Sequence, residues 1–203
     1  MDDIELRETE IQEGWRDNVF FINGKPLYEY FQEWTDFYKP EQLALCWSEK
    51  VDYKGDTRFV RYCLSLEHAN VPILMCPDDM DFSCTVIVAE VIKTDKTVTW
   101  NRIGSVLRTN WKSEDEQRSG VLMVEKYSDE DWERFGDTFV NANVYSPEYQ
   151  KYISENWDDE LYRRRMNHTF PYYQEDKNIN WFSKCSFVFE REKYEKLVES
   201  CYS

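Results

Sequence analysis

Two cysteines and three aspartates lie within nine residues of this chain, in the run Cys-Pro-Asp-Asp-Met-Asp-Phe-Ser-Cys that begins at Cys76. Thiolates and carboxylates are metal ligands, so Cys76, Asp79 and Cys84 are the candidate ligands of a metal site. Structural zinc needs four nitrogen or sulfur ligands, usually in closely spaced pairs, and no second Cys or His pair is near. Asp and Pro are common turn residues, and the pattern therefore favours a turn between two strands.

The same thiols are candidates for nucleophilic catalysis. A reactive cysteine needs a histidine or a cation beside it, and the charges of this loop are negative. The chain has two histidines, His68 and His168, and His68 reads as part of a polar loop. No GxGxxG, Walker, GxSxG, HExxH or EF-hand pattern occurs. The sequence favours a protein that is not an enzyme and binds no cofactor; the alternative is an enzyme of unknown reaction, with or without a metal, that uses Cys76, Asp79 and Cys84.

Net charge excludes several classes of partner. The 203 residues contain 25 Lys and Arg against 40 Asp and Glu, which gives a net charge of −15. Nucleic-acid binding depends on Lys and Arg, and an anionic membrane surface repels an acidic protein, so we expect neither as a partner. A hydrophobic content of 41% with 17% aromatic residues excludes a disordered acidic chain. Acidity of this kind is typical of a protein with a basic protein partner.

The acidic residues are unevenly distributed. Residues 1–14 carry six acids against Arg7, residues 113–137 carry nine acids against three bases, and residues 145–160 interleave five acids with Tyr and Trp. Such a section is either a solvated helical surface or a protein-binding face in which aromatic side chains anchor and carboxylates steer the partner. The candidate partner-binding residues are Glu114, Asp115, Glu116, Asp129, Glu130, Asp131, Trp132, Glu133, Tyr149, Trp157, Asp158 and Asp159.

The elements that must position these residues follow from hydrophobic periodicity and turn signals. Apolar and β-branched runs predict strands near residues 4–11 and at 19–22, 72–76, 84–94, 97–103, 121–124 and 186–190. Spacing and capping residues predict helices at 26–38, 40–48 and 190–201, with further helices that begin at Ser128, Ser146 and Asp158. Together they predict an α+β fold, an antiparallel β meander packed with helices on one side. We expect one domain over 1–203, with an acidic, helix-rich section at about 107–170.

Targeting signals are not evident in the sequence. The first residues are acidic, whereas a secretory signal is basic and then apolar. The most apolar run, from Thr85 to Ile92, is far shorter than the ~20 residues of a membrane span. We therefore expect a cytoplasmic protein whose six cysteines are reduced.

One family resemblance rests on residues 70–104 and on about the last 20 residues. The run PILMCPDDMDFSCTVIVAEV followed by TVTWNRIG resembles a family of small bacterial proteins that carry C-P-x-C-G-D-x-x-C-G between two strands and then V-x-W-x-x-(F/I)-G. The closing FVFEREKYEKL is similar to the end of that family. Its members are uncharacterised and often labelled oxidoreductases. Cys76, Pro77, Asp81 and Cys84 match the motif, whereas Asp79 replaces its middle cysteine, and this implies a loop kept for its shape.

A second resemblance is one of type. In size, acidity and lack of a catalytic motif, the chain is similar to immunity proteins of polymorphic toxin systems, including contact-dependent growth inhibition. This implies that it binds and occludes a cationic toxin domain in the cytoplasm. Because nuclease toxins have basic clefts, the implied toxin is a nuclease, of the RNase type.

Overall fold

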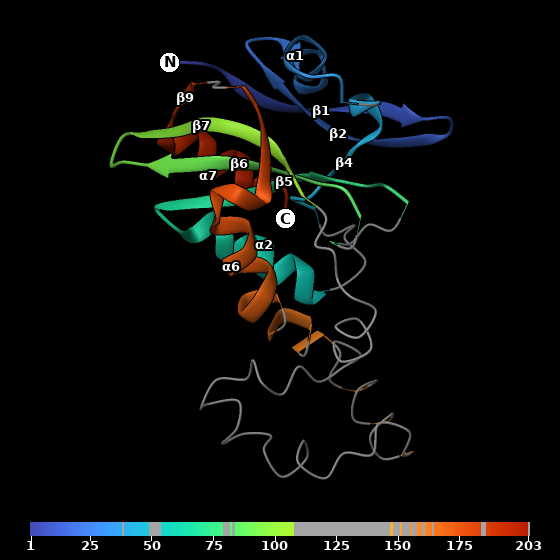
Figure 1. The fold of residues 1–203 in the computed structure, drawn as a ribbon. Helices are drawn as coiled ribbons and strands as arrows, with labels where there is room; N and C mark the ends of the chain where they lie inside the picture. The colour runs from blue at the N-terminus through green and yellow to red at the C-terminus, as the bar shows by residue number, and fades with distance from the viewer. Residues whose placement is uncertain are drawn as a thin grey trace.

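The computed structural model describes residues 1–37, 39–48, 54–78, 82, 84–107, 147, 151, 155, 158–159, 161–163, 165–183 and 186–202. These residues form two antiparallel sheets, here called sheet A and sheet B, and the helices that pack on them (Figure 1). Sheet A lies over one face of sheet B, and helices α2 (Lys54–Ser65) and α6 (Phe170–Gln174) lie below the other face. The fold is therefore α+β, as the sequence predicted.

Sheet A is a long hairpin with a short third strand. It contains β1 (Ile4–Gln12), β2 (Trp15–Ile22) and β3 (Lys25–Pro26) in that order. The Asn23-Gly24 turn between β2 and β3 has φ values of 53° and 77°, which Asn and Gly adopt at low cost. The turn of the β1–β2 hairpin projects from the body of the molecule (Figure 1).

Sheet B contains the predicted meander. Its strands are β4 (Ala44–Leu45), β5 (His68–Met75), β6 (Val86–Lys93), β7 (Thr97–Val106), β8 (Ile179–Ser183) and β9 (Phe187–Glu190). The order is β4-β5-β6-β7-β8, and β9 pairs with the first half of β7, so β8 and β9 share one neighbour. The strand predictions at 72–76, 84–94, 97–103 and 186–190 are confirmed.

The helices close the two outer faces. Besides α2 and α6 the described elements are α1 (Leu27–Trp34), α7 (Arg191–Ser200), the 3-10 turns η1 (Pro40–Gln42) and η4 (Asp176–Asn178), and a turn of π-helix, η3 (Arg165–Thr169). Helix α7 contacts β1, β7 and β9, so it lies on the side of sheet B that also carries sheet A. No helix within the described ranges is long and apolar enough to cross a membrane.

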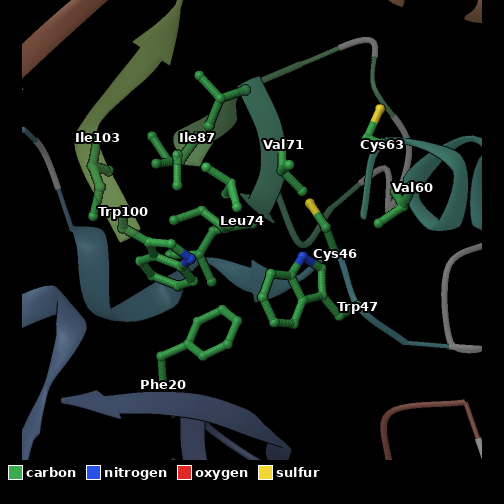
Figure 2. Packing of buried hydrophobic residues seen from close by; sticks show 14 of the residues in the cluster. Phe20, Cys46, Trp47, Val60, Cys63, Val71, Leu74, Ile87, Trp100 and Ile103 are labelled. Carbon is green, nitrogen blue, oxygen red and sulfur yellow. The ribbon is translucent and has the colours of Figure 1, made fainter. Parts of the chain in front are cut away.

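An aromatic cluster joins the two sheets. Phe20 of β2 is completely buried, and its ring lies 4.8 Å from Trp47 and 5.3 Å from Trp100, edge-on to both. Figure 2 shows Phe20 directed from sheet A toward these two indoles. Tyr194 of α7 and Phe189 of β9 complete the cluster, at 6.4 and 5.5 Å from Trp100. Burial of five large rings makes this contact the main apolar link between sheet A, sheet B and α7.

Two predictions about local structure are wrong. The predicted helix at 40–48 is instead η1 followed by β4, because Ala44 and Leu45 are buried and pair with Met75 and Leu74 of β5. His68, predicted in a polar loop, is the first residue of β5 and pairs with Ile92. In both places pairing with a strand distant in sequence outweighs the local pattern.

Part of the acidic section lies outside the described residues. The predicted strand at 121–124 and the predicted helix from Ser128 belong to this part. Pro147, Lys151, Glu155 and the residues 158–159 and 161–163 are helical. The helices that we expected to begin at Ser146 and Asp158 have starting points outside the described residues or next to undescribed ones, so these starts stay predictions.

Candidate functional site

The candidate metal and thiol site lies between β5 and β6. The backbone N–H of Cys76 donates to the carbonyl of Thr85 at 2.8 Å, which closes the loop where the two strands diverge. Cys76 and Cys84 are half-buried, and Asp79 lies outside the described residues. In the described ranges no three His, Cys, Asp or Glu side chains group as a metal site. In sequence this loop connects β5 to β6.

The other described thiols are inside the protein. Cys46 and Cys63 are completely buried, on opposite sides of the junction between β4 and α2 (Figure 2). Burial raises the pKa of both thiols well above the ordinary value. Burial also raises the pKa of Cys201 to about 11. These three thiols are therefore protonated near neutral pH and poor nucleophiles.

A buried ion pair holds α2 against the C-terminal helical turns. Asp56 of α2 is completely buried, and Arg165 of η3 donates to it through Nε at 2.7 Å. The guanidinium of Arg165 also lies 5.2 Å from the ring centroid of Phe82. A charge in this position needs its partner, because an uncompensated buried carboxylate is strongly destabilising. The ion pair with Arg165 therefore holds α2 in place, and the carboxylate of Asp56 has a structural role in this contact.

A second charged cluster crosses sheet B at β5, β6, β7 and η4. Arg102 donates to Glu90 through Nε at 2.8 Å and Nη2 at 3.1 Å, and to Asp176 through Nη2 at 2.9 Å. The same guanidinium lies 4.1 Å from the ring centroid of Trp181. Hydrogen bonds from Arg102 outweigh burial and lower the pKa of Glu90 to about 2. Glu90 is therefore a permanent carboxylate at neutral pH and not a general acid.

His68 lies at the rim of this cluster. Its Nε2 is 3.5 Å from Oε1 of Glu90, and 63% of its side chain is exposed. Two carboxylates face one guanidinium in the cluster, so these three side chains carry a net charge of −1. The arrangement fixes η4 to sheet B, and His68 and Asp176 are its two exposed side chains.

Two of the candidate partner-binding acids contact α2. The carboxylate of Asp158 accepts a hydrogen bond from the backbone N–H of Gly55 at 3.4 Å, at the first turn of α2. Asp159 forms an ion pair with Arg58, and half of each side chain remains exposed. Both acids thus contribute to the packing of α2, and Asp159 keeps a solvent-facing surface. The other ten candidates lie outside the described residues: Glu114, Asp115, Glu116, Asp129, Glu130, Asp131, Trp132, Glu133, Tyr149 and Trp157.

The described surface with the strongest acidic character is the β1–β2 hairpin, which we call the acidic hairpin (residues 1–22). It carries seven carboxylates and two arginines, a net charge of −5. Arg7 pairs with Glu5, and Arg16 pairs with Glu8 at 3.2 Å. Asp17 is buried and accepts a hydrogen bond from the backbone N–H of Leu45, so it anchors the hairpin to β4. The remaining acids give the hairpin a surplus of exposed negative charge.

Half-buried aromatic side chains border the acidic hairpin. Trp15, Phe21 and Tyr28 pack around a small apolar cluster of Ile11, Val19 and Ala44. Sheet A therefore carries a combination of aromatic rings and carboxylates of the kind that we predicted for residues 113–160. The surplus of acids in residues 1–14 was the sequence signal for this surface. Its aromatic border was not predicted, because it forms only when α1 and β4 pack on the hairpin.

Comparisons with protein families, curated proteins and solved structures find no significant match to this chain. The two resemblances drawn from the sequence therefore remain predictions.

Proposed function

We propose that the protein is an inhibitor that binds and occludes a cationic protein domain. The expected partner is a bacterial toxin domain, a nuclease of the RNase type, and the inhibitor would act as its immunity protein in the cytoplasm. The observation that carries the proposal is the acidic hairpin, which presents unneutralised carboxylates beside half-buried aromatic rings.

The distribution of charge supports a binding role. Inside the described part of the protein the charged groups form pairs that hold elements together, as Asp56 does with Arg165 and Glu90 with Arg102. On the acidic hairpin two arginines face six carboxylates outside the core, besides the buried Asp17, so charge remains available to an external partner. A basic cleft is the protein surface that such charge complements best.

The proposed mechanism has two parts. Carboxylates of the hairpin and of residues 113–160 would steer the basic domain into contact and raise the rate of association. Aromatic side chains such as Trp15 would then exclude water from the contact and slow dissociation. Occlusion of the cleft stops the toxin without any chemical step by the inhibitor.

A binding experiment with a neighbouring toxin domain tests this proposal. We would purify the C-terminal domain of the toxin encoded beside this gene and measure its RNase activity with increasing amounts of inhibitor. The expected result is complete inhibition at a 1:1 ratio, with an association rate that falls steeply as salt is added. If no toxin is encoded nearby, or if the toxin keeps its activity in an excess of inhibitor, the proposal is wrong.

Matched charge reversals locate the binding face. Glu130→Lys with Asp131→Lys alters the central acidic section, and Glu8→Lys with Glu10→Lys alters the hairpin. Asp95→Lys at the β6–β7 turn provides an exposed control outside both segments of the sequence. We expect slower association for either double variant and little change for Asp95→Lys. Equal rates for all three variants would contradict electrostatic steering by these faces.

A further inference from the structure

The acidic hairpin leaves one edge of sheet A open. Strand β1 pairs with β2 on one side, and in the described parts of the chain no strand pairs with it on the other. Near its start the edge is tied to sheet B, where Asp2 and Val188 of β9 exchange two hydrogen bonds of 2.6 and 2.7 Å. Beyond Leu6 the strand extends toward the projecting turn, with Arg7, Glu8 and Glu10 exposed (Figure 1).

The hydrogen-bonding pattern between β1 and β2 identifies which backbone groups of β1 point to the open edge. The backbone N–H of Asn23 donates to the carbonyl of Asp3, so these two residues form a hydrogen-bonded pair. Such pairs alternate with non-bonded pairs along an antiparallel ladder. The register continues without a shift from Ile4 opposite Ile22 to Glu10 opposite Arg16. The N–H and C=O groups of Leu6, Glu8 and Glu10 therefore point away from β2, and a docked strand could bond to all of them.

The character of the edge changes along its length. Ile4 and Leu6 face the core with Phe20, whereas Glu8 and Glu10 continue the same face of the strand into solvent. A second copy of this chain would place like carboxylates side by side, which is unfavourable. A strand with Lys or Arg at alternate positions would place a cation beside each of these carboxylates. Charge complementarity therefore selects a basic strand over self-association.

We propose that the outer edge of β1, from Leu6 to Glu10, receives an extended basic segment of a partner protein as an added strand. The assignment of this segment to a toxin domain rests on the proposed function. The open edge and its charge are independent of that function. Main-chain hydrogen bonds would supply affinity, and Glu10, together with Glu8 at its ion pair with Arg16, would supply the preference for basic residues.

A short blocked peptide of alternating Thr and Lys tests the edge without any toxin. We expect it to bind the intact protein at low salt and to slow amide hydrogen exchange at Leu6, Glu8 and Glu10, whereas a Thr and Glu peptide does neither. Protection at other residues alone, or equal binding of the two peptides, would overturn the proposal. Concentration-dependent dimers that protect the same amides would show that a second copy occupies the edge instead.

Two substitutions at Glu8 distinguish the contribution of its backbone N–H to peptide binding from the contribution of its charge. Glu8→Pro removes an outward N–H but leaves the bonds between β1 and β2, because Glu8 is in a non-bonded pair. Glu8→Thr removes the charge and keeps the N–H. We expect Glu8→Pro to weaken peptide binding about tenfold or more, and Glu8→Thr to weaken it only a few-fold. Unchanged binding by Glu8→Pro, or equal losses in both variants, would contradict strand addition.

A fold control and a toxin control complete the experiment. Unchanged exchange at Glu5 and Arg7, whose amides face β2, would show that Glu8→Pro keeps the hairpin; if it does not, exchange protection in the unsubstituted protein remains the deciding measurement. A toxin domain that is inhibited equally by Glu8→Pro would refute strand addition and leave the proposed function standing. If the peptide docks on the edge but the protein does not inhibit the toxin, strand addition would stand and the proposed function would be refuted.

Discussion

Gly55 and Asp158, which are 103 residues apart in the sequence, meet at the N-terminal turn of α2. The carboxylate of Asp158 accepts a hydrogen bond from the N–H of Gly55, and the backbone of Asp158 passes directly over the Gly55 Cα. A Cβ added at Gly55 would overlap the Asp158 carbonyl oxygen and lie 3.0 Å from the backbone nitrogen of Tyr162. Glycine at this position therefore allows α2 to pack against the helical residues around Asp158.

Gly55→Ala should destabilise the protein in spite of the higher helix propensity of alanine. The propensity gain is about 1 kcal/mol, whereas a clash with backbone costs about 1–3 kcal/mol or more. We expect a lower melting temperature in thermal unfolding followed by circular dichroism. Lys54→Ala, an exposed change at the preceding position, provides the control and should leave the melting temperature nearly unchanged. A more stable Gly55→Ala variant would contradict the close approach.

Phe20→Ala should weaken the contact between the two sheets. Loss of a fully buried phenylalanine leaves a cavity between Trp47 and Trp100, and such changes cost about 3–5 kcal/mol. Urea unfolding followed by tryptophan fluorescence would report both the loss and the altered surroundings of the two indoles. Phe20→Leu should lower the free energy of unfolding less than Phe20→Ala, because leucine fills more of the cavity. An equal decrease in both variants would contradict a simple cavity effect.

Stability should fall in acid partly through Glu90. Its pKa of about 2 in the folded protein lies below the ordinary value of 4.5. The contribution of its ionised form is therefore complete above about pH 4.5 and is lost as the pH falls toward 2. Glu90→Gln should lower the free energy of unfolding by about 1–3 kcal/mol at pH 7 and by much less near pH 2.

Urea titrations between pH 2 and 7 would measure this dependence. Glu192→Gln breaks an exposed pair with Lys196 on α7 and serves as the control, with little expected change. A Glu90→Gln variant with the same pH dependence as the unsubstituted protein would contradict the assignment to Glu90.

Thiol reactivity should separate the cysteines into two groups. Iodoacetamide reacts with the thiolate, so the buried Cys46 and Cys63, with their raised pKa values, should resist labelling until the protein unfolds. Cys76 and Cys84 are half-buried and should be modified first in the native protein. Peptide mass spectrometry of samples labelled with and without denaturant would measure the order. Early modification of Cys46 would mean that the junction of β4 and α2 opens readily.

The sequence predicted the strands of the meander well because their signal is local. Residues 84–94 and 97–103 are rich in β-branched residues and are separated by a tight turn, which becomes β6 and β7. The helix predicted at 40–48 failed for the opposite reason, since β4 owes its conformation to pairing with Leu74 and Met75. Helix α2 was not predicted, although its buried residues Phe59, Val60 and Cys63 follow helical spacing.

The candidate sites were only partly visible in the sequence. The acidic character of residues 1–14 was evident from composition, whereas its aromatic border depends on the packing of Tyr28 from α1. Neither the Asp56–Arg165 pair nor the Glu90–Arg102–Asp176 cluster was predicted. Their members are up to 109 residues apart, and no local pattern identifies partners at that distance.

The aromatic cluster also determines the order in which parts of the protein can fold during translation. Phe20 is translated early, but Trp100, Phe189 and Tyr194 of the same cluster follow only after some 80 to 174 further residues. Packing of the first hairpin therefore stays incomplete until β9 and α7 emerge, and contacts so distant in sequence form slowly. Until then the hairpin can pack only against the elements translated soon after it, α1 and β4, and its exposed carboxylates favour the solubility of the nascent chain.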